Sequence, residues 1–125
     1  MPRDDAVYLV HMLETARKAA GKVSGLDREQ FLADENLHLA LVYLVQVIGE
    51  AASRVSDETR VRHPSVPWRQ VIGMRHRVVH DYLAVDLEIV WAVVSEDLGP
   101  LIAALERIVP PQAGEPLDHA FSPSA

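Results

Sequence analysis

The sequence predicts an all-α fold, a four-helix up-and-down bundle with one or two short extra helices. Apolar residues recur at helical spacing in four long segments, and each segment follows a polar residue or a proline suited to start a helix. No segment shows the strict alternation of apolar and polar residues that is typical of a strand. At 125 residues the chain has the length of one domain. We expect that domain over residues 1–109 and a flexible tail over residues 110–125, where the periodicity is lost.

The first helix is expected over residues 5–23, because its apolar residues fall on one face and Asp4 or Asp5 can cap its start. Asp27 and Gln30 follow at the spacing of a capping box, which indicates a short helical turn. We therefore expect the chain to reverse direction between this helix and the next long one.

The second long helix is expected over residues 35–55, with Asp34 as its cap. This helix is apolar on nearly every side, so nearly every side must be covered. The cover comes either from helices of the same chain or from a second copy, and we favour a homodimer because large exposed apolar patches usually mark an interface. Tyr43 on this helix, with Trp68 and Trp91 further along, is expected in the core.

The third helix is expected to follow Pro67 and to continue to Tyr82, because one face carries a stripe at helical spacing. The stripe consists of Trp68, Val71, Ile72, Arg75, Val79 and Tyr82. Arg75 thus lies in line with core residues, where a guanidinium needs a partner. Asp86 is expected to cap a fourth helix, which Gly99-Pro100 should kink or break.

Composition excludes several classes of protein. The formal net charge of −6 argues against a surface that wraps nucleic acid on all sides. The chain has no cysteine, which excludes a disulfide framework and a thiolate metal site. There is no apolar run of about 18 residues that would suggest a membrane span, and the first residues do not resemble a signal peptide. We expect a cytoplasmic protein that does not associate with membranes.

One basic segment stands out in this acidic chain. Residues 60–80 contain five arginines, three histidines and no acidic residue. Such a segment is either a solvated helix face or a surface that binds an anion, and charge alone favours neither. If the segment binds an anion such as the phosphates of RNA, Arg69, His76 and Arg77 are its candidate contacts.

Arg75, His80 and Tyr82 combine three side chains suited to phosphate chemistry. Arginine binds phosphate bidentately, histidine transfers protons near neutral pH, and the tyrosine hydroxyl donates or accepts a hydrogen bond. On a straight helix, Arg75 and His80 would be separated by about 140° and about 7.5 Å of rise, so they would not face one point. Either the helix loosens near Val79, or each residue works with its counterpart in a second chain; both can hold together.

Cleavage of RNA without a metal needs a base for the 2′-OH proton, a cation for the charged phosphorane and an acid for the leaving oxygen. A single His80 cannot conveniently be both base and acid. A twofold dimer would bring two copies of the motif to one groove and supply both groups. The apolar second helix and the sparse motif thus favour the same assembly.

A metal site is the competing interpretation. His76 and His80 form an i,i+4 pair of the kind found in zinc helices. A metalloprotease would need a glutamate where Arg77 stands, a third ligand is not evident, and Arg75 and Arg77 would repel a cation. We therefore expect neither a metal nor another cofactor.

The segment from Arg75 to Tyr82 resembles the Arg-x4-His-x-Tyr motif of the HepT-like group of HEPN-domain proteins. The similarity covers residues 5–109 and is specific because several short segments contribute to it. They are Phe31-Leu32-Ala33-Asp34, Ile48-Gly49-Glu50-Ala51, His63-Pro64-Ser65-Val66-Pro67-Trp68, Ile72-Gly73-Met74-Arg75 and Val90-Trp91.

The resemblance implies a HEPN-like all-α homodimer with a composite ribonuclease site, acting as the toxin of a toxin–antitoxin pair. It implies catalytic roles for Arg75 and His80, and a partner, a minimal nucleotidyltransferase antitoxin, that silences the toxin by transferring AMP to Tyr82. An adenylyl group there would place bulk and negative charge where the RNA phosphate must lie. Family members often carry asparagine after the motif arginine, where this chain has His76, which leaves the role of His76 open.

A second hypothesis belongs to another functional class. The chain could be a non-catalytic HEPN module that docks a nucleotidyltransferase and a nucleotide. Both hypotheses predict a dimer, a basic groove and an accessible Tyr82. They differ in whether the purified protein cleaves RNA.

Overall fold

The computed structural model describes residues 3–81 and 84–109, and these residues confirm the all-α prediction. The long helices are α1 (Arg3–Val23), α3 (Glu35–Arg54), α5 (Trp68–Val78) and a final helix built from α6 (Leu87–Ala92), the π-helical turn η1 (Val93–Asp97) and α7 (Leu98–Glu106). Two short helices, α2 (Arg28–Leu32) and α4 (Asp57–Arg62), connect them. Two short strands, β1 (Val79–Asp81) and β2 (Ala84–Val85), follow α5. Residues 110–125, the expected tail, lie outside the described residues.

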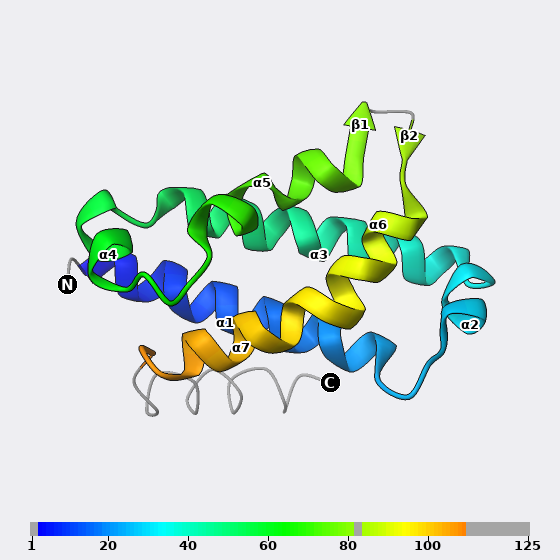
Figure 1. The fold of residues 1–125 in the computed structure, drawn as a ribbon, viewed down its shortest axis with the longest axis horizontal. Helices are drawn as coiled ribbons and strands as arrows, with labels where there is room; N and C mark the ends of the chain where they lie inside the picture. Colours follow the sequence, from blue (N-terminus) through cyan, green and yellow to red (C-terminus); the bar gives the residue numbers. More distant parts are fainter. Residues whose placement is uncertain (1–2, 82–83, 110–125) are drawn as a thin grey trace, which may run out of the picture.

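Helix α3 is the centre of the bundle. It packs against α1 on one side and α5 on another, while α7 lies along α1 (Figure 1). Its buried residues are Leu37, Leu41, Leu44, Val45, Ile48, Gly49, Ala51 and Ala52. The helices of the same chain therefore cover most of this apolar helix, and the cover left for a second copy is smaller than the sequence suggested.

Tyr43 is the main error in the predicted core. Its side chain is 66% exposed, as is that of Leu39 one turn earlier on α3. Trp68 is buried, and Trp91 is half-buried with its ring 5.2 Å from that of Phe31. Helical periodicity shows which face of a helix is apolar. It does not show which face the neighbouring helices leave uncovered.

The capping predictions are confirmed at three of four helix starts. Asp27 and Gln30 form a reciprocal capping box at α2, and the Asp34 carboxylate accepts a hydrogen bond from Leu37 N at 3.0 Å. Asp86 caps α6 by accepting from two backbone N–H groups. The prediction for the first helix is wrong, because α1 already begins at Arg3 and Asp5 lies inside it.

The predicted end of the third helix is also wrong. The third helix ends at Val78 instead of continuing to Tyr82, which lies outside the described residues, and the chain then forms a small antiparallel hairpin. Of the two outcomes expected at Gly99-Pro100, a kink or a break, the break does not occur, because the chain continues from α6 through the π-helical turn η1 into α7. Within the described ranges, no helix combines the length and the apolar character needed to span a membrane.

Candidate active site

Helix α5 carries the first half of the motif. Its inner side consists of Trp68, Val71, Met74 and Val78, all of which are buried. Position 75 belongs to the same stripe, because it comes four residues after Val71 and three before Val78. The backbone of α5 therefore places position 75 on the helix side that carries these buried residues.

Gly49 fixes how closely α5 approaches α3. A Cβ atom at this position would lie 3.2 Å from the carbonyl oxygen of Val71 and 3.5 Å from that of Ile72. The first of these distances is tighter than ordinary van der Waals contact, so any side chain here would press on the backbone of α5. The absence of a side chain at Gly49 thus sets the position of the helix that carries Arg75.

The second half of the motif lies on the hairpin. Val79 pairs with Val85 and Asp81 pairs with Ala84, so His80 is the extra residue on β1 and forms a bulge in the ladder. The N–H of Asp86 donates to the carbonyl oxygen of Val78 at 3.0 Å, which closes the base of the hairpin. Of the alternatives drawn from the sequence, the loosening of the helix near Val79 is what the backbone shows. Figure 1 shows this hairpin projecting from the bundle beyond the end of α5.

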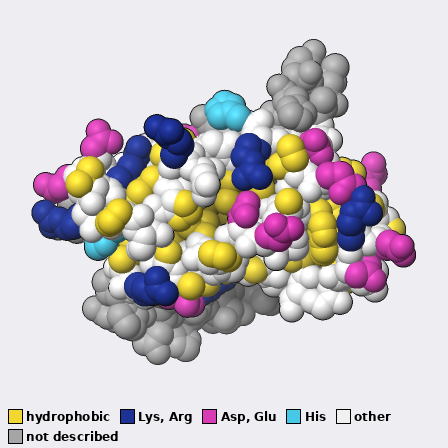
Figure 2. Space-filling model, in the orientation of Figure 1, with side chains coloured by type: hydrophobic (Ala, Val, Ile, Leu, Met, Phe, Trp, Pro, Cys, Tyr) yellow, Lys and Arg dark blue, Asp and Glu magenta, His cyan; other side chains and the backbone are white. Residues whose placement is uncertain are grey.

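The three candidate RNA-contacting residues are all exposed, but they do not share one face. Arg69 and His76 are seven residues apart and lie on the same outer side of α5. Arg77 points to a different side, where its Nη1 lies 3.4 Å from Oδ2 of Asp97 on η1. Figure 2 shows basic side chains and a histidine along the edge formed by α5, with acidic side chains over the last helix.

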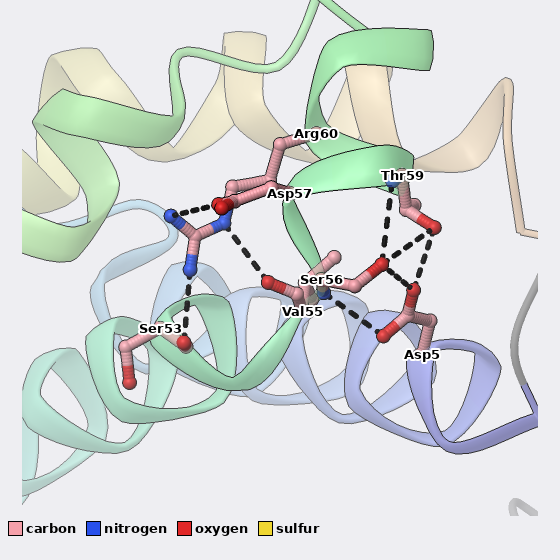
Figure 3. A network of polar contacts seen from close by, with 7 residues as sticks. All are labelled: Asp5, Ser53, Val55, Ser56, Asp57, Thr59 and Arg60. Carbon is pink, nitrogen blue, oxygen red and sulfur yellow. Dashed lines mark hydrogen bonds and ion pairs between the residues drawn. The ribbon is translucent and has the colours of Figure 1, made fainter.

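Arg60 belongs to the basic segment of the sequence but has a structural role. Its Nε donates to the carbonyl oxygen of Val55 at 3.0 Å and its Nη2 to that of Ser53 at 2.8 Å (Figure 3). These carbonyls lie at the C-terminal end of α3, where the helix leaves them without partners of its own. Arg60 therefore ties α4 to the end of α3.

A groove between α1 and α3 was not predicted from the sequence. It has a volume of about 360 Å³ and is lined by Tyr8, His11, Tyr43, Gln46, Val47, Glu50, Ala51 and Arg54. Tyr8 and then Glu50 raise the pKa of the Arg54 guanidinium above its usual value, and Arg54 Nη2 lies 3.1 Å from Glu50 Oε1. The residues recur at the spacing of one helix side, but the sequence could not show that α1 leaves this side open.

The part of the chain that the structure describes contains no cluster of three His, Cys, Asp or Glu side chains able to hold a metal ion. The side chains of His80 and Tyr82 lie outside the described part.

Comparison with known proteins gives consistent matches. A protein of Thermococcus cleftensis named as a probable ribonuclease HepT is 32% identical over 108 residues, which cover 86% of this chain and 98% of that protein. A protein of Caldanaerobacter subterraneus subsp. tengcongensis, provisionally named as an RNase, is 31% identical over 102 residues, which cover 82% of this chain and 91% of that protein. No solved structure gives a significant match.

The family described as "Ribonuclease HepT-like" matches residues 12–108, which run from the middle of α1 to the end of the last helix and include the whole of α5 and its hairpin. The match thus spans both halves of the candidate site as well as the helices that support them. By this match and by the relatives that agree with it, the chain belongs to the ribonuclease HepT-like family.

Proposed function

We propose that this chain is the toxin of a toxin–antitoxin pair, an endoribonuclease that acts without a metal on cellular RNA in the cytoplasm. Its family membership supports the ribonuclease activity. The observation that carries the choice of site is the bulge at His80, two residues beyond the end of α5. Bulges re-aim a side chain locally and are enriched next to active sites.

The proposed mechanism assigns one task to each motif residue. A His80 imidazole takes the proton of the 2′-OH, and the resulting oxygen attacks the adjacent phosphorus. Arg75 stabilises the extra negative charge of the phosphorane. The bond from phosphorus to the 5′ oxygen breaks, and a second imidazole, in its protonated form, gives that oxygen a proton. Tyr82 contacts the substrate through its hydroxyl.

The need for two imidazoles supports a composite site in a homodimer. Each chain supplies one His80, so a twofold pair supplies a base and an acid at one phosphate. The exposed Leu39 and Tyr43, one turn apart on α3, offer apolar surface for the contact between the chains.

The outer side of α5 supports an RNA path that leads to the motif. Arg69 and His76 lie exposed along this side, and Arg77 lies exposed beside it. An arginine and a histidine one above the other on a helix can follow successive phosphates of a strand. Because the rest of the protein is acidic, these basic residues on α5 would hold the RNA on one side of the molecule.

The proposed partner is a minimal nucleotidyltransferase antitoxin that transfers AMP to Tyr82. The transfer would form a bond between the Tyr82 oxygen and the α-phosphorus of ATP and release pyrophosphate. The added phosphate would oppose the attraction between Arg75 and RNA. Intact mass measurement after incubation with the partner and ATP should show the added AMP on the wild type and none on Tyr82→Phe.

The catalytic assignment is tested by cleavage of total RNA in the presence of EDTA. We expect His80→Ala and Arg75→Ala to lower the rate by at least about 100-fold, the effect of losing an acid–base group or a charge stabiliser. Circular dichroism should show unchanged helix content. Glu106→Gln, far from the motif on α7, is the control and should retain full activity.

Full cleavage by His80→Ala would remove His80 from the mechanism. If the wild type itself never cleaves RNA but still binds the nucleotidyltransferase, the non-catalytic docking module becomes the better account of the chain.

A further inference from the structure

The last helix contains a π-helical turn opposite the end of α5. In this turn, η1, the N–H of Leu98 donates to the carbonyl oxygen of Val93, five residues back instead of four. Pro100 accounts for the irregularity, because it has no N–H to offer the carbonyl of Glu96 and the regular ladder cannot pass through it. Turns of this kind are rare and often occur at functional sites.

The π-helical turn determines where Asp97 points. One extra residue in a turn changes the direction of the following side chains by about 100° relative to a regular helix. In this structure Oδ2 of Asp97 lies 3.4 Å from Nη1 of Arg77, two positions after Arg75 on the motif helix. The turn therefore brings a carboxylate to an exposed arginine that borders the proposed RNA path.

The ion pair between Arg77 and Asp97 does not have the properties of a contact that stabilises the fold. Its single contact is long, and the two side chains remain 46% and 42% exposed. Exposed ion pairs of this kind contribute little to stability. Asp97 is the N-cap residue directly before α7 but makes no side-chain capping hydrogen bond there. The contact is thus weak enough for a stronger anion to displace it.

We propose that Asp97 limits RNA affinity by competing with an RNA phosphate for Arg77. The idea rests on the proposed function of the site. A phosphate binds guanidinium with two parallel hydrogen bonds, which are stronger than one long contact to a carboxylate. When RNA is bound, the Asp97 carboxylate stays beside the phosphate and repels it. Asp97 therefore weakens binding and so favours release of the cleaved strand.

The test is equilibrium binding of a fluorescent, fully 2′-O-methylated RNA oligonucleotide, which lacks the 2′-OH needed for cleavage. Fluorescence anisotropy is measured over a range of salt concentrations for Asp97→Asn, Arg77→Ala and the double variant. Glu106→Gln is the matched control, because Glu106 pairs with Arg17 at 2.7 Å with side chains 49% and 45% exposed, but links α7 to α1.

Asp97→Asn should tighten RNA binding by about 3- to 10-fold and steepen the logarithmic salt dependence by about 0.7, the value for one more unit of positive charge set against the phosphates of a single strand. In the Arg77→Ala background the same substitution should change affinity by less than about twofold, as should Glu106→Gln.

Three results would overturn the proposal. Equal tightening with and without Arg77 would show a general effect of charge, and unchanged binding would show that Asp97 does not compete. Weaker binding would show that Asp97 holds Arg77 in its productive position. If the wild type binds no RNA at all, the proposed function fails as well, and this outcome is distinct from the other three.

Discussion

Asp5 is the residue whose environment differs most from its predicted role. It lies inside α1 at 3% exposure and accepts hydrogen bonds from Ser56 N at 3.0 Å, Ser56 Oγ at 2.6 Å and Thr59 Oγ1 at 2.6 Å (Figure 3). A buried carboxylate is tolerated only when it is hydrogen-bonded in this way. Asp5 thus joins the start of α1 to the start of α4, across 51 residues of sequence.

The pKa of Asp5 is lowered in the folded protein. Burial acts to raise it, but the hydrogen bonds from Ser56 and Thr59 lower it by more. A carboxyl group with a depressed folded pKa stabilises the fold fully above its unfolded pKa of about 4 and loses that contribution as the pH falls through the folded value. The stabilisation is therefore complete at neutral pH and disappears in acid.

Asp5→Asn should lower the free energy of unfolding by about 2–3 kcal/mol at pH 7, because the substitution weakens three hydrogen bonds to a charged acceptor. The difference from the wild type should shrink below pH about 4. Urea unfolding at several pH values measures both effects. Asp57→Asn is the control, since the Asp57 side chain is 96% exposed, and should change stability by less than about 1 kcal/mol. Equal effects of the two substitutions would contradict the role given to Asp5.

Sequence reasoning identified Asp5 as a polar residue at a helix start but could not find its partners. Ser56 and Thr59 are distant in sequence, and only the packing of α4 on α1 brings them to the carboxylate. The same limit applies to Arg60, which the sequence showed only as a member of the basic segment. Local patterns identify the type of a side chain, whereas its partner depends on tertiary contacts.

At the scale of elements, the contact between α3 and α5 decides where the motif lies. Gly49→Ala should lower the free energy of unfolding by about 1–3 kcal/mol, because the new methyl group presses on the Val71 carbonyl oxygen 3.2 Å away. Thermal unfolding measures the loss. The shift of α5 should also reduce RNA cleavage, since it moves Arg75 relative to the hairpin.

Gly21→Ala is the matched control for this substitution. Gly21 lies in α1 with no atom within 4 Å of an added Cβ, so alanine should be tolerated and should stabilise the helix by up to about 1 kcal/mol. If Gly49→Ala were as stable and as active as Gly21→Ala, the close approach would not control the position of α5.

The end of α5 shows why the helix prediction failed at one place. Val79 and Tyr82 continue the apolar stripe, so periodicity favoured a longer helix. Val78 and Val79 are β-branched, and this favours extended backbone where a partner strand is present. Ala84 and Val85 provide that strand. Strands of two or three residues are too short to show a recognisable alternation of apolar and polar residues. The helical spacing of the apolar residues therefore decided the prediction.

At the scale of the whole molecule, the composite site predicts how inactive chains affect active ones. If one site needs His80 from both chains, a dimer of one wild-type and one His80→Ala chain is inactive. After co-refolding equal amounts of the two, about one quarter of the wild-type rate per dimer should remain, because only that share of dimers contains two intact chains. Chains that act alone would retain about one half.

This mixing experiment is read from initial rates of RNA cleavage at several mixing ratios. Mixing the wild type with Glu106→Gln, which should be active, controls for losses on refolding. A rate proportional to the wild-type fraction, or light scattering that shows monomers at working concentration, would contradict the composite site.

The fold class, three of the four predicted caps and the family were accessible from the sequence, because each depends on local pattern or on a motif with a long supporting similarity. For helix α3, the sequence predicted the apolar character but not what covers it. Its apolar character was correctly identified, but its cover comes mainly from α1 and α5 of the same chain. Only three-dimensional packing reveals that Leu39 and Tyr43 remain exposed.

The ladder between β1 and β2 is short, with Val79 opposite Val85 and Asp81 opposite Ala84. A pair of strands this small is marginally stable in water without other support. His80 thus lies in a segment whose backbone rearranges at a small cost in free energy, while the helices of the bundle hold most of the buried residues. If His80 acts as proposed, a rearrangement of the hairpin alone would abolish RNA cleavage and leave the bundle folded, so that activity would return without refolding of the helices.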